Sequence, residues 1–158
     1  MRCLDLELPP KNDPRRDETI RWFVSVNIFT ARMTIADDDM LQEFDMFGLW
    51  TMRGALEDVE SSLDERDAMI PAAEAWISVA GPQMYHWDRE FEYGPTIGDA
   101  GGGGPLWNGK HGFCQQRWDL WRRRFAVLSQ QEDLSEHLRG LARKAEQRML
   151  AIETEAGE

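Results

Sequence analysis

Cysteine is scarce in this sequence of 158 residues: Cys3 and Cys114 are the only two, and neither belongs to a C-x-x-C pair. Two isolated cysteines do not make the disulfide framework of a small secreted domain, and this usage is typical of a reducing compartment. The first residues include acids where a signal peptide has its apolar stretch. We therefore expect a cytoplasmic protein.

Long apolar runs are absent as well. A helix that crosses a bilayer needs about 18 consecutive apolar residues. The best apolar stretch here, residues 22–28, is interrupted by Ser25 and Asn27. We therefore expect no membrane partner.

Positive charge is limited, because 18 basic residues face 29 acidic ones and the net charge is −11. The distribution is uneven: residues 1–109 carry a net charge of −12, whereas residues 110–148 carry +4. A chain with this excess of acid repels phosphate backbones, so we expect no nucleic-acid partner. The basic segment either faces the acidic part of the protein or attracts an acidic ligand.

The alternating apolar pattern of β-strands is also missing, and the apolar residues recur at helical spacing instead. Residues 1–16, which include three prolines, read as an extended N-terminal arm or a frayed tail. The length of the chain suits one domain, which we place at residues 17–155. We predict an all-α fold, a bundle of five or six helices with one long glycine-rich loop.

The first helix is expected to begin near Asp17, which is an acceptable N-cap, and to run to about Met33. Apolar side chains occupy nearly every face of residues 20–33. A helix of that kind is typical of the middle of a bundle.

Further helices follow from the spacing of apolar residues and from capping signals. The second is expected to follow the three aspartates at 37–39, with an apolar stripe that reaches Val59. The third is expected to start at Ile70–Pro71 and to be interrupted at Gly81–Pro82, with more helix up to about Tyr93.

Residues 94–112 form the expected loop, and its glycines at 101–104 lack the spacing of a phosphate-binding P-loop. A loop of this length inside a compact domain is functional or disordered. After the loop, a helix is expected to start near Phe113. The last helix is expected to open with a capping box made by Asp133 and Glu136.

Three polar residues stand on apolar helix faces: Asn27, Asp45 and Arg117. Burying such groups without partners costs several kcal/mol, so each needs a hydrogen bond or an ion pair. In one interpretation, Asp45 pairs with Arg117 or with Arg53 and ties helices together. In the other, the three residues line a pocket, where Asp45 is a base or an anchor and Arg117 is an anion clamp.

The histidines do not form a metal-binding pattern, because His86, His111 and His137 lie on three separate segments without neighbouring cysteines. We therefore expect no metal. His86 is the strongest candidate for proton transfer, since a phenol and carboxylates crowd the same turn. The alternative is an ordinary mixed-charge turn on the surface.

Seven tryptophans in one small domain are unusual, and most are expected in the core. Trp107, within the glycine-rich loop, is the tryptophan we expect to lie over a groove. The residues that we consider for substrate binding are polar or aromatic: Asn27, Trp50, Trp76, Tyr85, Trp107, Trp118 and Trp121.

Residues 104–125 contain the pattern G-P-L-W, then G-F-x-x-x-R-W-x-x-W-x-x-R-F. This block resembles a fungal family of domains of unknown function, and residues 49–57 and 73–81 are similar to other helical blocks of that family. The resemblance covers roughly residues 20–152 and implies an intracellular, largely helical protein without an established activity, in a family that can accompany metabolic gene clusters. The family pattern leads us to expect serine where Cys114 stands, at the N-cap of a helix.

Two functions fit these observations. The first is a cofactor-free cyclase, isomerase or lyase that acts on a hydrophobic metabolite, with Asp45, His86 and Arg117 as catalytic residues and the glycine-rich loop closing over the pocket. The second is a non-catalytic helical module that binds a protein partner or forms a homodimer through an exposed apolar patch.

Overall fold

The computed structural model describes residues 6–36, 43–59 and 62–158. The described residues form five helices and four two-residue strands, which confirms the predicted all-α class. The helices are α1 (Arg16–Thr34), α2 (Asp45–Leu56), α3 (Leu63–His86), α4 (Gln115–Gln130) and α5 (Glu136–Ala156).

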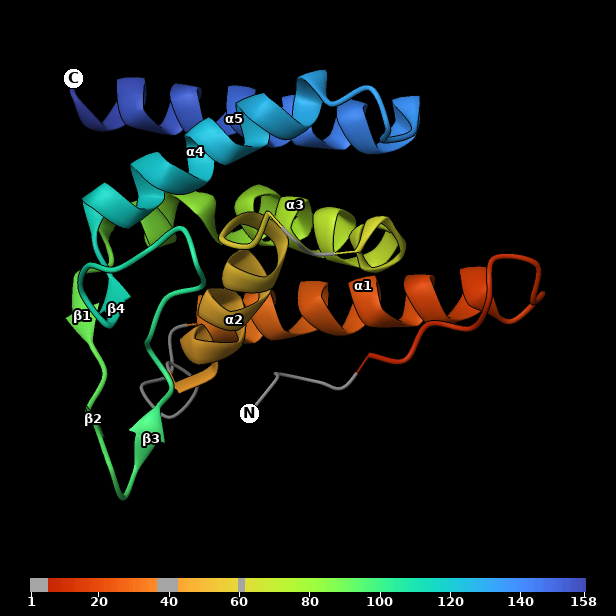
Figure 1. Cartoon of the computed structure of the whole chain (residues 1–158). Helices are drawn as coiled ribbons and strands as arrows, with labels where there is room; N and C mark the ends of the chain where they lie inside the picture. Colours follow the sequence, from red (N-terminus) through yellow and green to blue (C-terminus); the bar gives the residue numbers. More distant parts are fainter. Residues whose placement is uncertain (1–5, 37–42, 60–61) are drawn as a thin grey trace.

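Helix α3 lies at the centre of the bundle. It packs against α1 on one side and against α5 on the other, with α2 and α4 also in contact with it (Figure 1). Small residues on several faces of α3, among them Ala73, Ala80 and Gly81, are buried and let the neighbouring helices approach closely. The bundle therefore has three layers, with α1 in the lowest and α5 in the highest layer of Figure 1.

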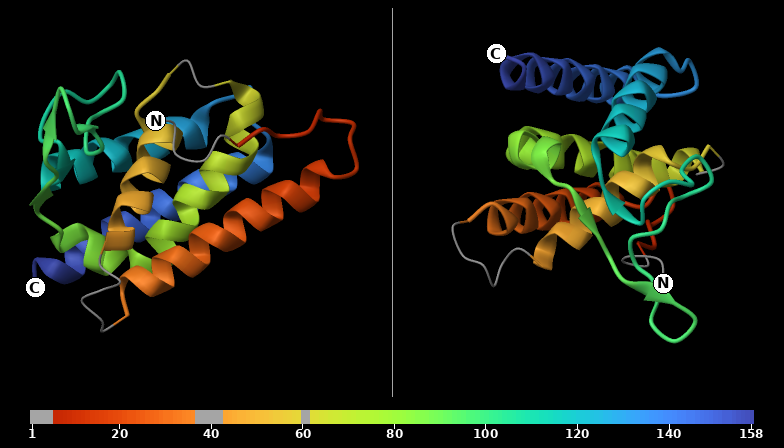
Figure 2. Two further views of the ribbon diagram at one scale, coloured as in Figure 1. Left: turned by 90° about the horizontal axis from the view of Figure 1, so that it is seen from below. Right: turned by 90° about the vertical axis from the view of Figure 1, so that its left-hand side faces the viewer.

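The prediction that the first helix occupies the middle of the bundle is wrong. Helix α1 buries Phe23, Asn27 and Ala31 on one face, whereas Trp22 and Phe29 are 59% and 63% exposed. The prediction failed because some of the apolar side chains of residues 20–33 face solvent and not other helices. Figure 2 shows α1 along one outer edge of the molecule.

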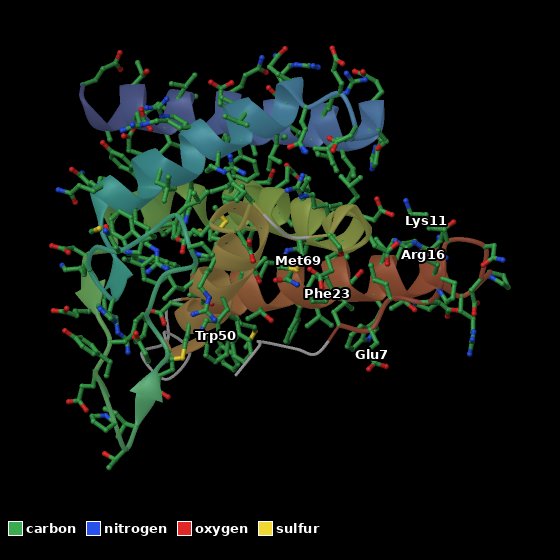
Figure 3. The ribbon with its side chains drawn as sticks, in the orientation of Figure 1. Glu7, Lys11, Arg16, Phe23, Trp50 and Met69 are labelled. Atoms are coloured by element: carbon green, nitrogen blue, oxygen red, sulfur yellow. The ribbon has the colours of Figure 1, made fainter. Side chains whose placement is uncertain are left out.

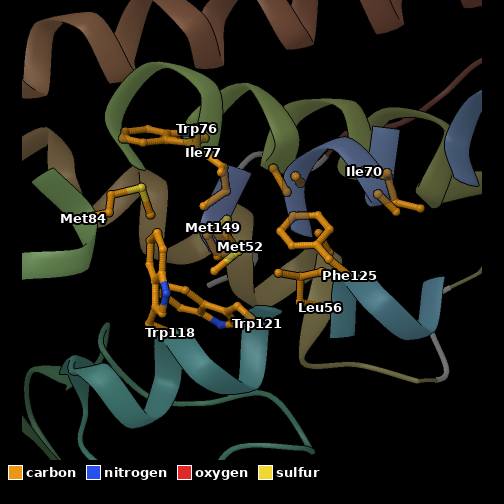
Figure 4. Close-up of a cluster of buried hydrophobic side chains, with 14 of the residues drawn as sticks. Met52, Leu56, Ile70, Trp76, Ile77, Met84, Trp118, Trp121, Phe125 and Met149 are labelled. Atoms are coloured by element: carbon orange, nitrogen blue, oxygen red, sulfur yellow. The ribbon is translucent and has the colours of Figure 1, made fainter. Parts of the chain in front are cut away.

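The core lies between α3 and the three helices α2, α4 and α5 (Figure 4). Trp76 of α3 and Trp121 of α4 are the largest of its fully buried side chains. Gly48 of α2 makes room for Trp76, because a Cβ atom added at Gly48 would lie 2.9 Å from the indole ring. The core residues labelled in Figure 4 are Met52, Leu56, Ile70, Trp76, Ile77, Met84, Trp118, Trp121, Phe125 and Met149.

The predicted start of a helix at Ile70–Pro71 and its interruption at Gly81–Pro82 are both wrong. Helix α3 begins at Leu63, where the Ser62 hydroxyl accepts a hydrogen bond from the Glu65 N–H at 3.1 Å, and it continues through both prolines. Each proline removes one helical hydrogen bond. Helical residues on both sides of each proline remain buried against the same neighbouring helices, and we attribute the continuity of α3 to this packing.

Helix ends differ from the predictions at two further places. Helix α3 stops at His86, so the expected helical stretch to Tyr93 does not form. Helix α5 is capped by Ser135, whose hydroxyl accepts from the Leu138 N–H at 3.2 Å, and not by Asp133. The predicted cap at residues 37–39 lies outside the described residues.

The N-terminal arm is packed from residue 6 onward. Leu6 and Leu8 lie against the apolar cluster around Phe23 of α1, and Figure 3 shows the arm running back along α1. Arg16 fixes the turn between the arm and the helix, because its guanidinium donates to the Pro9 carbonyl at 2.6 Å and to Asp67 at 2.7 Å. Residues 6–10 therefore lie along α1 without helix or strand structure of their own.

Two short antiparallel ladders organise the connection between α3 and α4. Strand β1 (Arg89–Glu90) pairs with β4 (Gly112–Phe113), and β2 (Tyr93–Gly94) pairs with β3 (Gly98–Asp99). Gly98 has a φ of +78°, which favours glycine at this turn. The ladders bring the beginning and the end of the glycine-rich loop together.

Asn27 joins three helices in the bundle. Its Oδ1 atom accepts one hydrogen bond from the Thr51 hydroxyl of α2 and one from the Trp76 indole of α3, both at 2.8 Å. Its amide donates to the Phe23 carbonyl at 2.9 Å. All these groups are buried, so Asn27 has the structural role that its position on an apolar face demands.

We predict that Asn27→Ala lowers the free energy of unfolding by about 2–4 kcal/mol, because it leaves two buried donors without acceptors. Urea denaturation measures this loss, with Asn12→Ala, at an exposed residue of the arm, as a matched control that changes stability little. A loss for Asn27→Ala no larger than that of the control would contradict the role of this hydrogen-bonded junction.

Candidate functional site

A fully buried ion pair joins the end of α2 to the beginning of α4. The Arg117 guanidinium donates to Glu57 through Nε at 2.7 Å and through Nη2 at 3.0 Å. Neither side chain has any exposed surface. Such a pair is stable only when the remaining polar atoms also find partners.

The glycine-rich loop supplies those partners. Arg117 Nη1 donates to the carbonyl oxygens of Gly101 and Gly112, and Nη2 donates to that of Gly102, at 2.8–3.1 Å. All five N–H groups of the guanidinium are therefore engaged. The loop is anchored to α4 in this way and does not form the free lid that we considered from the sequence.

Glu57 is saturated as well. One carboxylate oxygen also accepts from the Trp121 indole at 2.7 Å, and the other accepts from the Gly104 N–H at 2.8 Å. A Cβ atom added at Gly104 would lie 2.9 Å from the Glu57 carbonyl oxygen, so the close approach requires glycine. The rings of Trp107 and Trp121 lie 5.6 and 5.7 Å from the guanidinium of Arg117.

The predicted pairing of Asp45 with Arg117 or Arg53 is wrong. The partner of Arg117 is Glu57, which sequence reasoning missed. Arg53 donates to the Gly102 carbonyl at 3.1 Å and so also binds the loop. Glu57 directly follows Leu56 at the end of the apolar stripe of α2, and this position is the feature of the sequence that could have indicated its burial.

Asp45 pairs instead with Arg89, whose Nη1 atom lies 2.8 Å from Asp45 Oδ2. The other carboxylate oxygen, Oδ1, is buried and has no hydrogen-bond partner among the described residues. Burial raises the pKa of the Asp45 carboxyl, and the charge of Arg89 offsets only part of this effect. Arg89 also lies over the ring of Phe91, 4.6 Å from its centre.

A surface pocket of about 650 Å³ lies between the end of α3 and the beginning of α4. Three of the predicted site residues, Tyr85, His86 and Trp107, line it together. Asp45 and Arg117 do not. The full set of lining residues comes from two stretches of the chain: Tyr85, His86, Trp87, Asp88, Trp107, Gly109, Lys110, Cys114, Gln115 and Gln116.

The aromatic walls of this pocket are held in place. The Tyr85 ring stands edge-on to His86 and to Trp118, with centres 5.2 and 5.3 Å apart. The Trp107 indole donates to the Lys110 carbonyl at 2.9 Å, and the Lys110 ammonium forms an ion pair with Asp88 across the opening. The pocket therefore combines fixed aromatic surface with polar groups.

The beginning of α4 forms the polar side of the pocket. Cys114, a free thiol, occupies the N-cap position, but its side chain makes no capping hydrogen bond, and the first turn of α4 contains no acid. Helix α4 starts at Gln115, directly after this cysteine. Sequence reasoning missed Trp87, Lys110 and the glutamines as pocket residues, because the pocket forms only when the loop folds back onto α3.

The other residues considered for substrate binding have structural roles. Trp118 is buried and donates to Glu153 at 2.9 Å, while Trp76 and Trp121 lie in the core. Trp50 donates to the Ala100 carbonyl at 2.8 Å and lines, with Asn27, a hollow of about 20 Å³, which is too small for a ligand.

Within the described ranges, no group of three or more His, Cys, Asp or Glu side chains is arranged to hold a metal ion. None of the helices in those ranges has both the length and the apolar character needed to cross a membrane.

A family model described as "Protein of unknown function (DUF3632)" matches residues 3–125. This match covers most of the chain, so the protein belongs to that family. The matched region includes α1 to α3, the glycine-rich loop and α4 up to Phe125. No curated protein and no solved structure matches the chain.

We predict that Arg117→Met lowers the free energy of unfolding by about 3–5 kcal/mol, because it leaves the Glu57 carboxylate buried without its counter-ion. The matched control is Arg123→Met on the same helix, since Arg123 is largely exposed and pairs with Asp119. Chemical denaturation compares the two variants. Equal stabilities of the two variants would contradict the role of the buried pair.

A second prediction concerns pH. Because the pKa of Asp45 is raised in the folded state, that state holds the proton to higher pH, and Asp45 reduces stability as pH rises above about 4. Asp45→Asn removes this loss and keeps an acceptor for Arg89, so the stability of the variant relative to wild type increases from pH 4 to pH 7.

Asp13 is the control, because its effect on stability changes with pH in the opposite direction. Hydrogen bonds from Arg15 lower the pKa of Asp13 to about 2, so Asp13 contributes stability that is lost as pH falls toward that value. Asp13→Asn therefore loses stability relative to wild type as pH rises from about 2 to 4. Urea denaturation at several pH values measures both trends, and a flat or falling difference for Asp45→Asn would show that its folded-state pKa is not raised.

Proposed function

We propose that the protein binds a small, planar, amphipathic molecule in the pocket between α3 and α4. The observation that supports this most strongly is the convergence of Tyr85, His86 and Trp107, which come from two segments, on one pocket. Its volume of about 650 Å³ lies in the range that small-molecule sites occupy.

The walls indicate the class of ligand. Tyr85 and Trp107 offer aromatic surface that suits a planar apolar group. Lys110 and the uncapped first turn of α4 suit a hydrogen-bond acceptor or an anionic group on the same molecule. The ligand is therefore more polar than the purely hydrophobic metabolite expected from the sequence.

We extend the proposal to catalysis by proton transfer, in the class of cofactor-free isomerases, cyclases and lyases. His86 is exposed to the pocket at the end of α3, and imidazole is the side chain most often used for this chemistry. Arg117 has no free N–H group left for a substrate, so its contribution in this proposal is to position the loop and Trp107.

In this proposal, the protein acts in a fungal metabolic pathway in the cytoplasm. The family resemblance supports the fungal and metabolic part, and the free thiol of Cys114 fits a reducing compartment. The ligand would then be an aromatic or otherwise unsaturated intermediate of such a pathway.

The test is a thermal-shift screen of planar aromatic carboxylates, each paired with its uncharged amide. Ligands that bind the folded state raise the unfolding temperature, and we expect carboxylates to exceed their amides. For the best compound, we expect His86→Ala and Trp107→Phe each to raise Kd by about tenfold, measured by calorimetry.

His137→Ala is the matched control, because His137 is exposed on α5 and lies outside this pocket. It should leave Kd unchanged. A screen without binders, or a binder whose Kd is the same in wild type, His86→Ala and Trp107→Phe, would overturn the proposed site.

A further inference from the structure

The outward face of α1 carries two large aromatic side chains that are mainly exposed. Trp22 is 59% exposed and Phe29 is 63% exposed. They are seven positions apart in the sequence, so they lie on the same face of the helix about 10 Å apart along its axis. Figure 2 shows α2 and α3 on the inner side of α1.

Charged residues frame this aromatic pair. Glu18 precedes it on the same face, and Arg32 follows it at the edge of that face, both exposed. Ser25 lies between the aromatic residues and is also exposed. Along α1, this face therefore presents an acidic residue, an aromatic residue, a small residue, a second aromatic residue and a basic residue, in that order.

The centres of the two pairs nearly coincide, half a residue apart along α1. Trp22 and Phe29 are centred between Ser25 and Val26, and Glu18 and Arg32 are centred on Ser25. A two-fold axis at this point places each member of a pair opposite the other member in a second, antiparallel copy. In such an arrangement residue i contacts residue j and j contacts i, as a symmetric dimer requires.

We propose that the outward face of α1 binds a second copy of this chain, with the two α1 helices antiparallel. Trp22 of each copy packs against Phe29 of the other, and Glu18 pairs with Arg32 at both ends. Ser25 at the crossing point lets the helices approach closely. The aromatic contacts supply most of the affinity, and the ion pairs set the orientation.

One observation favours a second copy over another protein: the charges of Glu18 and Arg32 on the face are complementary to themselves under the two-fold axis. A hollow of about 530 Å³, lined by Arg21, Ser25 and His137 among others, also adjoins the face. It extends the available contact surface from α1 to the beginning of α5.

The first experiment is sedimentation of the full chain over concentrations from about micromolar to millimolar. We expect wild type to shift toward twice the monomer mass as concentration rises. Trp22→Glu and Phe29→Glu should each raise the dimer Kd by about tenfold or more. Val127→Glu and Leu150→Glu, which alter exposed apolar residues on α4 and α5, should leave it unchanged.

Charge reversal tests the antiparallel orientation. Glu18→Arg and Arg32→Glu each place like charges opposite one another and should weaken the homodimer. An equimolar mixture of the two single variants, and the double variant Glu18→Arg/Arg32→Glu alone, restore opposite charges at both ends and should dimerise as wild type does. Circular dichroism should show the same helix content in every variant, because the altered residues are exposed.

Three results would overturn the proposal. Wild type could remain a monomer over the whole concentration range. A dimer could persist in Trp22→Glu and Phe29→Glu while Val127→Glu or Leu150→Glu abolishes it. Finally, the mixture of charge-reversed variants could dimerise no better than either variant by itself, which would exclude the antiparallel pairing.

Discussion

The buried pair of Glu57 and Arg117 is the interaction on which the site depends. It joins the end of α2 to the beginning of α4 and holds the glycine-rich loop by its backbone. An apolar pair in the same place would fill the space but could not bind carbonyl oxygens and an N–H group at once. The loop lies where it does because its backbone completes the hydrogen bonding of two buried charges.

This constraint explains the composition of the loop and the position of Trp107. The backbone must come within hydrogen-bond distance of Glu57 and Arg117, and Gly104 leaves the space for that approach. Once the loop is anchored, Trp107 lies beside the Arg117 guanidinium on one side and lines the pocket on the other. A long loop forms this wall of the pocket, and hydrogen bonds from Arg117 of α4 hold the loop in place.

The parts of the fold that could be predicted from the sequence depend on local periodicity. Helices α4 and α5 follow from their apolar stripes, whose spacing depends only on the helix itself. The continuity of α3 through Pro71 and Pro82 could not be predicted, because it depends on packing against other helices. The partners of Arg117 and Asp45 lie 60 and 44 residues away, at Glu57 and Arg89, and no local pattern encodes such distances. In the candidate site, Tyr85, His86 and Trp107 could be singled out from the sequence, but the sequence did not show that they line one pocket together.

The pocket and the outer face of α1 belong to different layers of the molecule, and α3 connects them. Its Trp76 binds Asn27 of α1, and its last residues, Tyr85 and His86, form one wall of the pocket. In an antiparallel pair of α1 helices, the α3–α4 ends of the two copies remain outside the contact, since α1 alone carries the pairing residues. Self-association would therefore leave both pockets accessible. Coupling between the two events would have a route along α3, which packs against all four other helices.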